Sequence, residues 1–131
     1  MVIDTSAIVA ILFGEPEAAT FAEAIERDAV RLISAASVLE AAIVIESELG
    51  DPGARELDLL LYQAGITISP FSPEHLAAAR HAFRAFGKGR HAAALNFGDC
   101  FSYALSRSTG EPLLFKGEDF PRTDVAPCLL P

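Results

Sequence analysis

Short apolar segments that alternate with amphipathic helical segments constrain the fold of this 131-residue chain more than any other feature. The expected strands are residues 2–4, 30–34, 65–69 and 111–115. The expected helices are residues 5–13, 17–27, 35–49, 54–64, 72–86 and 98–108. Such alternation is typical of a mostly parallel sheet with helices on both faces. We therefore predict an α/β fold with three layers.

Composition places the chain among globular proteins of one domain, residues 1–131. Hydrophobic residues make up 51% of the sequence, which is enough for a core. No apolar stretch approaches the roughly 18–20 residues of a membrane span, and no basic segment precedes the first apolar run. The two cysteines, Cys100 and Cys128, are too few for a disulfide framework. These features predict a cytoplasmic protein with reduced thiols.

The net charge of −8 argues against a protein that coats nucleic acid, because phosphate binding requires Lys and Arg. It is compatible with an enzyme whose acids surround a cation, or with a basic partner segment.

Asp4 ends the first apolar segment, directly before Thr5 and Ser6. Two interpretations are open for it. Its carboxylate could cap the following helix, which is worth about 1 kcal/mol, or it could contribute to a site at the carboxyl ends of the strands.

Glu40 lies in the most apolar helical segment, on a stripe beside Ile43 and Val44. This crowding predicts partial burial, and a buried carboxylate needs a partner or a metal ion. The alternative is a narrow polar stripe that faces water.

Asp99 follows Gly98 near the start of a helix, where a first-turn or cap role would also explain it. Glu118 and Asp119 lie in the turn after the last apolar segment, where acids are common in any protein.

Together, acids at the ends of several strands favour a shared site. Carboxylates about 4 Å apart repel by roughly 1–4 kcal/mol, so such a group must bind protons or a cation. Oxygen ligands without a suitable His/Cys set favour Mg²⁺ or Mn²⁺ over zinc. The sequence contains no GxSxG, P-loop or GxGxxG motif, so serine nucleophile, nucleoside triphosphate and dinucleotide chemistries receive little support.

Four segments in this order resemble the PIN-domain nucleases, and within them the VapC-type toxins of type II toxin–antitoxin (VapBC) systems. They are MVIDTSA, SVLEAAIVI with Glu40, FGDCFSYALS and LLFKGEDF. The resemblance spans essentially the whole chain. It implies a PIN-like α/β/α fold and metal-dependent endoribonuclease activity, with Mg²⁺ or Mn²⁺ as cofactor.

By this resemblance, Asp4, Glu40 and Asp99 are the catalytic and metal-binding acids. The family's fourth position falls on Gly117, so the role passes to Glu118, ranked first, or to Asp119. Thr5 and Ser6 are expected to orient the first carboxylate or contact water at the metal.

The resemblance also implies partners: an RNA substrate, with transfer RNA ranked ahead of ribosomal RNA, a cognate VapB-type antitoxin, and a second copy in a homodimer. An antitoxin arginine would enter the acid cluster, and the helices at 17–27 and 35–49 would form its groove. The expected RNA-binding residues are Lys88, Arg90, His91, Lys116 and Arg107.

Two alternatives remain open from the sequence. One is a non-catalytic α/β binding module in which the acids are only caps and turn residues. The other is a metal-dependent phosphatase or DNA nuclease that uses the same acids.

Overall fold

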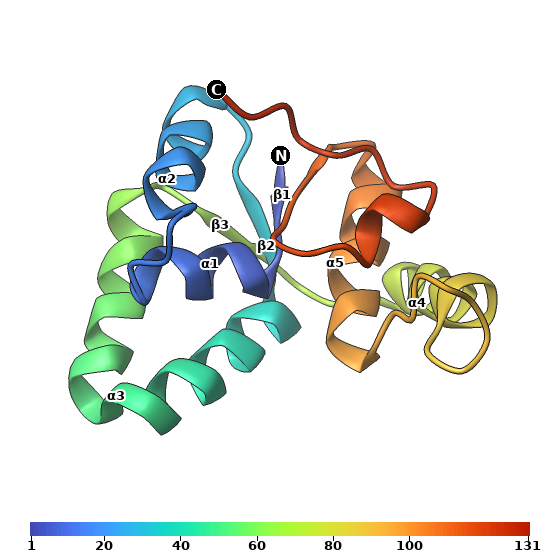
Figure 1. Ribbon diagram of the computed structural model, residues 1–131, viewed down its shortest axis with the longest axis horizontal. Helices are drawn as coiled ribbons and strands as arrows, with labels where there is room; N and C mark the ends of the chain where they lie inside the picture. The colour runs from blue at the N-terminus through green and yellow to red at the C-terminus, as the bar shows by residue number, and fades with distance from the viewer.

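The computed structural model describes residues 1–131. The strands are β1 (Val2–Ile3), β2 (Leu32–Ser34), β3 (Thr67–Ser69) and β4 (Leu113–Leu114). The helices are α1 (Thr5–Leu12), α2 (Ala18–Arg27), α3 (Ala35–Gln63), α4 (Pro73–Phe86) and α5 (Phe97–Thr109), followed by a short 3₁₀ helix, η1 (Phe120–Arg122). Figure 1 shows α1, α2 and α3 on one side of the strands and α4 and α5 on the other.

The four strands form one parallel sheet in the order β3-β2-β1-β4. Val2 of β1 is in register with Leu32 on one side and with Leu113 on the other. The prediction of a parallel sheet between helical layers is confirmed. Because all strands run the same way, the residues that follow β1, β2 and β4 meet at one edge of the sheet.

Successive strand residues serve two separate cores, as the two-residue period of a strand requires. Ile3 and Leu114 pack with α1, α2 and α3 in one hydrophobic cluster. Val2 and Leu113 face the other way and pack with α4 and α5. Both faces of the sheet are therefore covered by apolar side chains, which explains why the strand segments are uninterrupted apolar runs in the sequence.

The helices begin and end close to the predicted positions, with one difference in α3. The predicted helices at 35–49 and 54–64 are continuous as α3, but Gly50 has φ 64° and ψ −150° and kinks it. The expected break is therefore present as a bend. Figure 1 shows that the two halves of α3 run in different directions on either side of this bend.

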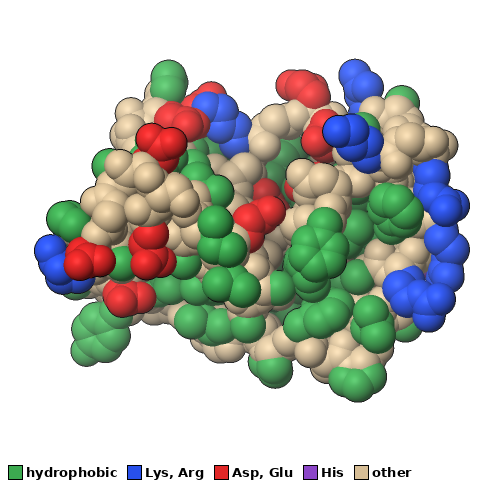
Figure 2. All heavy atoms as spheres, turned by 90° about the horizontal axis from the view of Figure 1, so that it is seen from below, with side chains coloured by type: hydrophobic (Ala, Val, Ile, Leu, Met, Phe, Trp, Pro, Cys, Tyr) green, Lys and Arg blue, Asp and Glu red, His purple; other side chains and the backbone are tan.

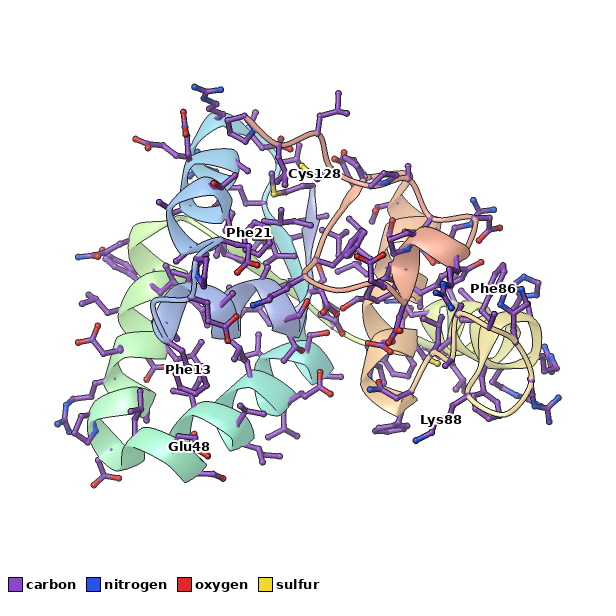
Figure 3. The ribbon with its side chains drawn as sticks, in the orientation of Figure 1. Phe13, Phe21, Glu48, Phe86, Lys88 and Cys128 are labelled. Atoms are coloured by element: carbon purple, nitrogen blue, oxygen red, sulfur yellow. The ribbon has the colours of Figure 1, made fainter.

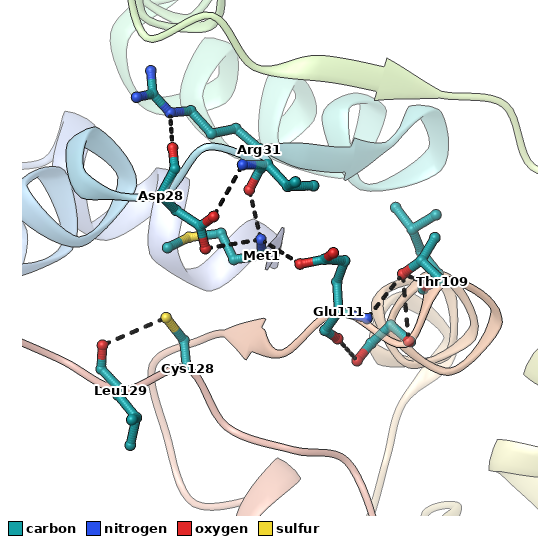
Figure 4. Close-up of polar contacts among 10 residues, drawn as sticks. Met1, Asp28, Arg31, Thr109, Glu111, Cys128 and Leu129 are labelled. Atoms are coloured by element: carbon teal, nitrogen blue, oxygen red, sulfur yellow. Dashed lines mark hydrogen bonds and ion pairs between the residues drawn. The ribbon is translucent and has the colours of Figure 1, made fainter.

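The amino group of Met1 lies among three oxygen acceptors at the opposite edge of the sheet (Figure 4). It donates to the carboxylates of Asp28 and Glu111, at 3.0 Å each, and to the carbonyl of Val30 at 2.5 Å. Hydrogen bonding from the Val30 amide lowers the pKa of Asp28. These contacts fix β1 between α2 and the segment that enters β4.

Cys100 and Cys128 are both free thiols, as predicted. Cys100 is buried beside α4, and Cys128 is half-buried near the C-terminus (Figure 3). No helix is both long enough and apolar enough to cross a bilayer.

Candidate active site

Asp4 lies at the carboxyl end of β1 and is buried, with 3% of its surface exposed. Its Oδ2 accepts hydrogen bonds from the Ser6 amide at 3.0 Å and the Ser6 hydroxyl at 2.6 Å. Its Oδ1 accepts from the Ser102 hydroxyl at 2.5 Å. Oδ2 therefore caps α1, and Oδ1 links the end of β1 to α5. The two interpretations of this residue are therefore compatible.

A chain of buried hydroxyl groups holds Asp4 in place. Ser102 lies 3.3 Å from the hydroxyl of Ser37, and Thr5 donates to the Ser37 carbonyl at 3.1 Å. Ser102 and Ser37 were missed as site residues by the sequence reasoning. Their only signal is helical spacing, since Ser102 lies three residues after Asp99 and Ser37 three before Glu40.

Asp99 occupies the third position of α5, where it forms a capping box with Asn96. Its Oδ2 accepts from the Asn96 amide at 3.0 Å, and its own amide donates to Asn96 Oδ1 at 2.9 Å. Burial raises the pKa of Asp99 to about 6, and the negative charges of Asp4, Asp119 and Glu40 add to the rise. Carboxylates from three other chain segments thus act on Asp99.

Glu40 is half-buried, as predicted, but the predicted cause is wrong. Ile43 and Val44 are 59% and 37% exposed and leave their side of α3 open to solvent. Gly98 at the start of α5 is what covers the Glu40 carboxylate. A Cβ atom on Gly98 would lie 1.9 Å from Glu40 Oε2 and 2.7 Å from Oε1. The absence of a side chain at position 98 therefore makes room for this carboxylate.

The fourth acid comes from the turn after β4. Gly117 has φ 114°, which only glycine adopts readily, and the exposed Glu118 and Asp119 follow it. The charge of Asp119 contributes to the raised pKa of Asp99, whereas that of Glu118 is not among its causes. Asp119 is thus a candidate for the fourth position beside Glu118, which the sequence ranks first.

The five expected RNA-binding residues do not form one group. Lys88, Arg90 and His91 are exposed on the loop before α5, and Figure 3 shows Lys88 pointing away from the body of the protein. Lys116 forms ion pairs with Glu15 and Glu17, which raise its pKa. Arg107 lies near the far end of α5, 3.8 Å from Asp124.

As they stand, no three His, Cys, Asp or Glu side chains form a ready ligand set for a metal ion. The donors nevertheless fit a hard divalent cation, because the site offers carboxylate and hydroxyl oxygens. Burial is the main cause of the raised Asp99 pKa, and the negative charges of Asp4, Asp119 and Glu40 add to it. A cation would relieve this repulsion.

Comparison with known proteins identifies the family. The PIN domain family model matches residues 1–126. The chain is 56% identical to the ribonuclease VapC30 of Mycobacterium tuberculosis over 131 residues, 100% of each chain. It is 58% identical to a ribonuclease VapC of Mycolicibacterium smegmatis over 126 residues, 96% of this chain and 98% of the relative.

The chain therefore belongs to the PIN domain family and, within it, to the VapC ribonucleases. It is a ribonuclease toxin of the VapBC type, and this membership implies an RNA substrate and a VapB-type antitoxin. The structure of Mycobacterium tuberculosis VapC20, described as a Sarcin-Ricin loop cleaving toxin, matches with a TM-score of 0.79. That match covers 99% of this chain and 98% of the other at 16% identity, and it shows the shared fold.

Proposed function

We propose that this VapC ribonuclease cuts RNA internally with a divalent cation, Mg²⁺ or Mn²⁺, held by Asp4, Asp99 and Glu40. One observation carries the proposal: Asp4 accepts a hydrogen bond from Ser102 of α5 and Glu40 packs against Gly98 of the same helix, so both lie beside Asp99. Burial raises the pKa of Asp99, and the charges of Asp4, Asp119 and Glu40 raise it further. Helix capping alone would explain Asp4 and Asp99. It would not explain why the charges of Glu40 and Asp119 also reach Asp99 and raise its pKa.

Each acid has a distinct part in this proposal. Asp4 is held by Ser6 and Ser102, so its carboxylate is a rigid ligand. Asp99 is held by the Asn96 amide and keeps its other oxygen for the cation. Asp119 is the favoured fourth acid, with Glu118 as the alternative. When bound, the cation would neutralise charge on the scissile phosphate and promote ionisation of a nearby water molecule.

Glu40 is the preferred proton acceptor for the attacking water, with Glu118 as the alternative. Glu40 is half-buried against Gly98 and points into the cluster, whereas Glu118 is exposed in the turn. A base within reach of the reacting water is the first requirement for general base catalysis. The hydroxyl of Thr5 makes no hydrogen bond to Asp4; it donates to the Ser37 carbonyl and so links α1 to α3.

Positive contacts to RNA are assigned first to Lys88, Arg90 and His91, on the loop that leads into Asp99. Lys116 follows β4 on the same side as the acids, but Glu15 and Glu17 already engage its charge. Arg107 is the weakest candidate, since it lies two turns of α5 beyond Asp99. Transfer RNA remains the first proposed substrate. The fold shared with VapC20 makes a ribosomal RNA loop the second.

The proposed partners are a second copy of the chain and the antitoxin. Leu39, Ile43 and Val44 form an exposed apolar strip on the first half of α3, which supports a protein contact there. For the antitoxin, which the sequence expects between residues 17–27 and 35–49, we propose a groove between α2 and the second half of α3 instead. The hollow beside α2 is lined by Ile25 of that helix and by Leu60 from the second half of α3.

The test compares RNA cleavage by the wild-type chain and by Asp4→Asn and Asp99→Asn variants, with Mg²⁺, with Mn²⁺ and with a chelator. Asparagine retains an oxygen for each helix cap, so the fold should persist while the charge is lost. We expect metal-dependent internal cleavage by the wild type and at least a 100-fold loss in each variant. Metal-independent cleavage, or unchanged variants, would contradict the proposal.

Substrate class is tested in the same assay. Total RNA, duplex DNA and a phosphomonoester are supplied in parallel, and cleavage of RNA alone is expected. Sequencing of the RNA ends after a short induction in cells then separates transfer RNA from ribosomal RNA. Hydrolysis of the phosphomonoester or the duplex would favour the phosphatase or DNA nuclease alternative.

A further inference from the structure

An apolar groove lies between α4 and α5, next to the acid cluster but outside it. Its volume is about 730 Å³, within the roughly 300–1,000 Å³ of small-molecule sites. Four phenylalanines line it, Phe71, Phe83, Phe97 and Phe101. A groove with this lining suits a flat aromatic ligand better than an isolated phosphate.

The aromatic rings are arranged so that one of them stays open. Phe101 makes edge contacts with Phe71 at 4.8 Å and with Phe97 at 4.9 Å between ring centroids. These contacts fix Phe97 from one side. The side chain is nevertheless 82% exposed, which is unusual for so large an apolar group. Phe97 is therefore held in place by Phe101 while most of its ring is open to solvent.

The groove adjoins the proposed active site along α5. Phe97 is the first residue of α5, and Asp99 follows two positions later. Cys100, next to Asp99, lines the groove as well. A ligand that occupies the groove would thus lie next to the acid cluster, because Phe97 and Asp99 are two residues apart in α5.

Cations without acidic partners surround the groove. Arg80 and Arg84 line it, and Lys88 and Arg90 follow on the next loop. None of the four forms an ion pair, and no Asp or Glu occurs between His75 and Gly98. Figure 2 shows this basic band at the right edge, beside a green apolar area and away from most of the red acids. In a protein of net charge −8, such a band marks an anionic ligand.

We infer that this groove is a subsite for single-stranded RNA, in which Phe97 stacks on an unpaired base beside the cleaved phosphate and Arg80 and Arg84 contact the flanking phosphates. The inference rests on the proposed ribonuclease function and extends it to substrate selection. Stacking on an aromatic ring accepts any base but requires that the base be unpaired. The groove would therefore direct cleavage to loops and other unpaired RNA.

The groove could instead hold a helix of another protein chain. An apolar partner would explain the phenylalanines but not four cations without acidic partners, of which Arg90 stacks over Phe83. An acidic protein partner would not explain why the groove adjoins Asp99. RNA accounts for both features, and it is the substrate of the family. A protein occupant is an outcome that the following experiment detects.

The chain contains no tryptophan, so Phe97→Trp introduces a single fluorescent reporter. Phe97 is exposed, so the substitution should not disturb folding. The matched control is Tyr62→Trp, because Tyr62 at the end of α3 is 85% exposed and outside the groove. Both are made in a Glu40→Gln background, so that RNA is bound without being cut.

A ten-nucleotide oligouridine RNA is titrated into each reporter, and the same oligomer without bases serves as the second probe. We expect saturable quenching of the Phe97→Trp reporter by oligouridine, no saturable quenching of the Tyr62→Trp reporter, and none of either by the abasic oligomer. Absence of quenching would overturn the inference. So would a blue-shifted, concentration-dependent emission of the Phe97→Trp reporter, which would show a second copy in the groove.

Binding of labelled RNA, followed by anisotropy, gives an independent measure. Phe97→Ala should weaken it by about 5- to 150-fold. In the Arg80→Gln, Arg84→Gln double variant, the slope of log affinity against log salt concentration should fall by the amount that about two phosphate contacts contribute. The control is Arg55→Gln, since Arg55 is an exposed residue of α3. It should leave the affinity for RNA and its salt dependence unchanged. Equal effects of the control and the groove variants would refute the phosphate contacts.

Cleavage by the otherwise wild-type chain separates this inference from the function on which it depends. Quenching without any metal-dependent cleavage would leave the groove as an RNA site and reject the proposed catalysis. Cleavage without quenching would reject the groove alone. Neither cleavage nor quenching would reject both.

Discussion

Replacement of Gly98 by alanine offers a test in which activity and stability should change in opposite directions. The new Cβ would lie 1.9 Å from Glu40 Oε2, while ordinary contact begins at 3.4 Å, so the carboxylate must move by about 1.5 Å. Glu40 is half-buried and flexible, which makes this movement cheap for the fold. Alanine is also better than glycine in a helix, by up to about 1 kcal/mol.

The displacement should nevertheless be costly for catalysis. A misplacement of about 1 Å in a reacting group can lower a rate by roughly 100-fold. We therefore expect Gly98→Ala to cleave RNA about 100-fold more slowly in the presence of Mg²⁺. Its thermal midpoint should equal that of the wild type or exceed it by a few degrees. The assays are cleavage of an RNA substrate under single-turnover conditions and thermal unfolding by circular dichroism.

A double-mutant cycle makes the reasoning refutable. In a Glu40→Ala background the carboxylate is absent, so Gly98→Ala should cause little further loss of activity. Full activity of Gly98→Ala would show that the position of Glu40 does not matter. An equal loss in both backgrounds would show that position 98 acts by another route, such as the start of α5.

Three further outcomes follow from the same contacts. The pKa of Asp99 is about 6 in the folded protein, above its ordinary 3.8, so its contribution to the free energy of unfolding is full below about pH 4 and is lost as the pH rises through 6. Chemical denaturation without divalent ions should therefore show that Asp99→Asn is more stable than the wild type at pH 7.5 but not at pH 3.5. Ser102→Ala leaves a buried Asp4 oxygen unpaired and should cost about 1–3 kcal/mol of unfolding free energy in urea, against under about 0.5 for Ser108→Ala. Asp119→Asn should reduce metal-dependent cleavage more than Glu118→Gln does, and the reverse order would restore Glu118 as the fourth acid.

The layout of the fold could be predicted because its signals are local. Alternating apolar strands and amphipathic helices predict a parallel sheet between two layers, and chain order alone then brings Asp4 and the turn after β4 to one edge. The sequence predicts that α5 begins at residue 98, whereas Asn96 is the cap and Phe97 the first helical residue. The Asn-x-x-Asp capping box was present in the sequence and would have located it.

The details of the site depend on contacts between distant segments, which spacing does not encode. Glu40 is covered by Gly98 and not by its own helical neighbours, because the start of α5 crosses that face of α3. The choice between Glu118 and Asp119 depends on the backbone at Gly117, whose φ of 114° sets the direction of the following turn. No residue pattern in a four-residue turn determines such an angle.

The acids of this site also hold the fold together, and this affects how their roles can be separated. Asp4 caps α1 and Asp99 completes the capping box of α5, so the same oxygens satisfy backbone donors and face the cluster. Alanine at either position would remove a cap worth about 1 kcal/mol together with the charge. Asparagine at position 99 removes the charge and keeps an oxygen for the cap, whereas at position 4 it also replaces one of two accepting oxygens with an amide donor. If repulsion is what the cation relieves, Asp99→Asn should gain stability without metal and lose most of the stabilisation that metal gives the wild type. A residue that serves only as a cap would show neither change.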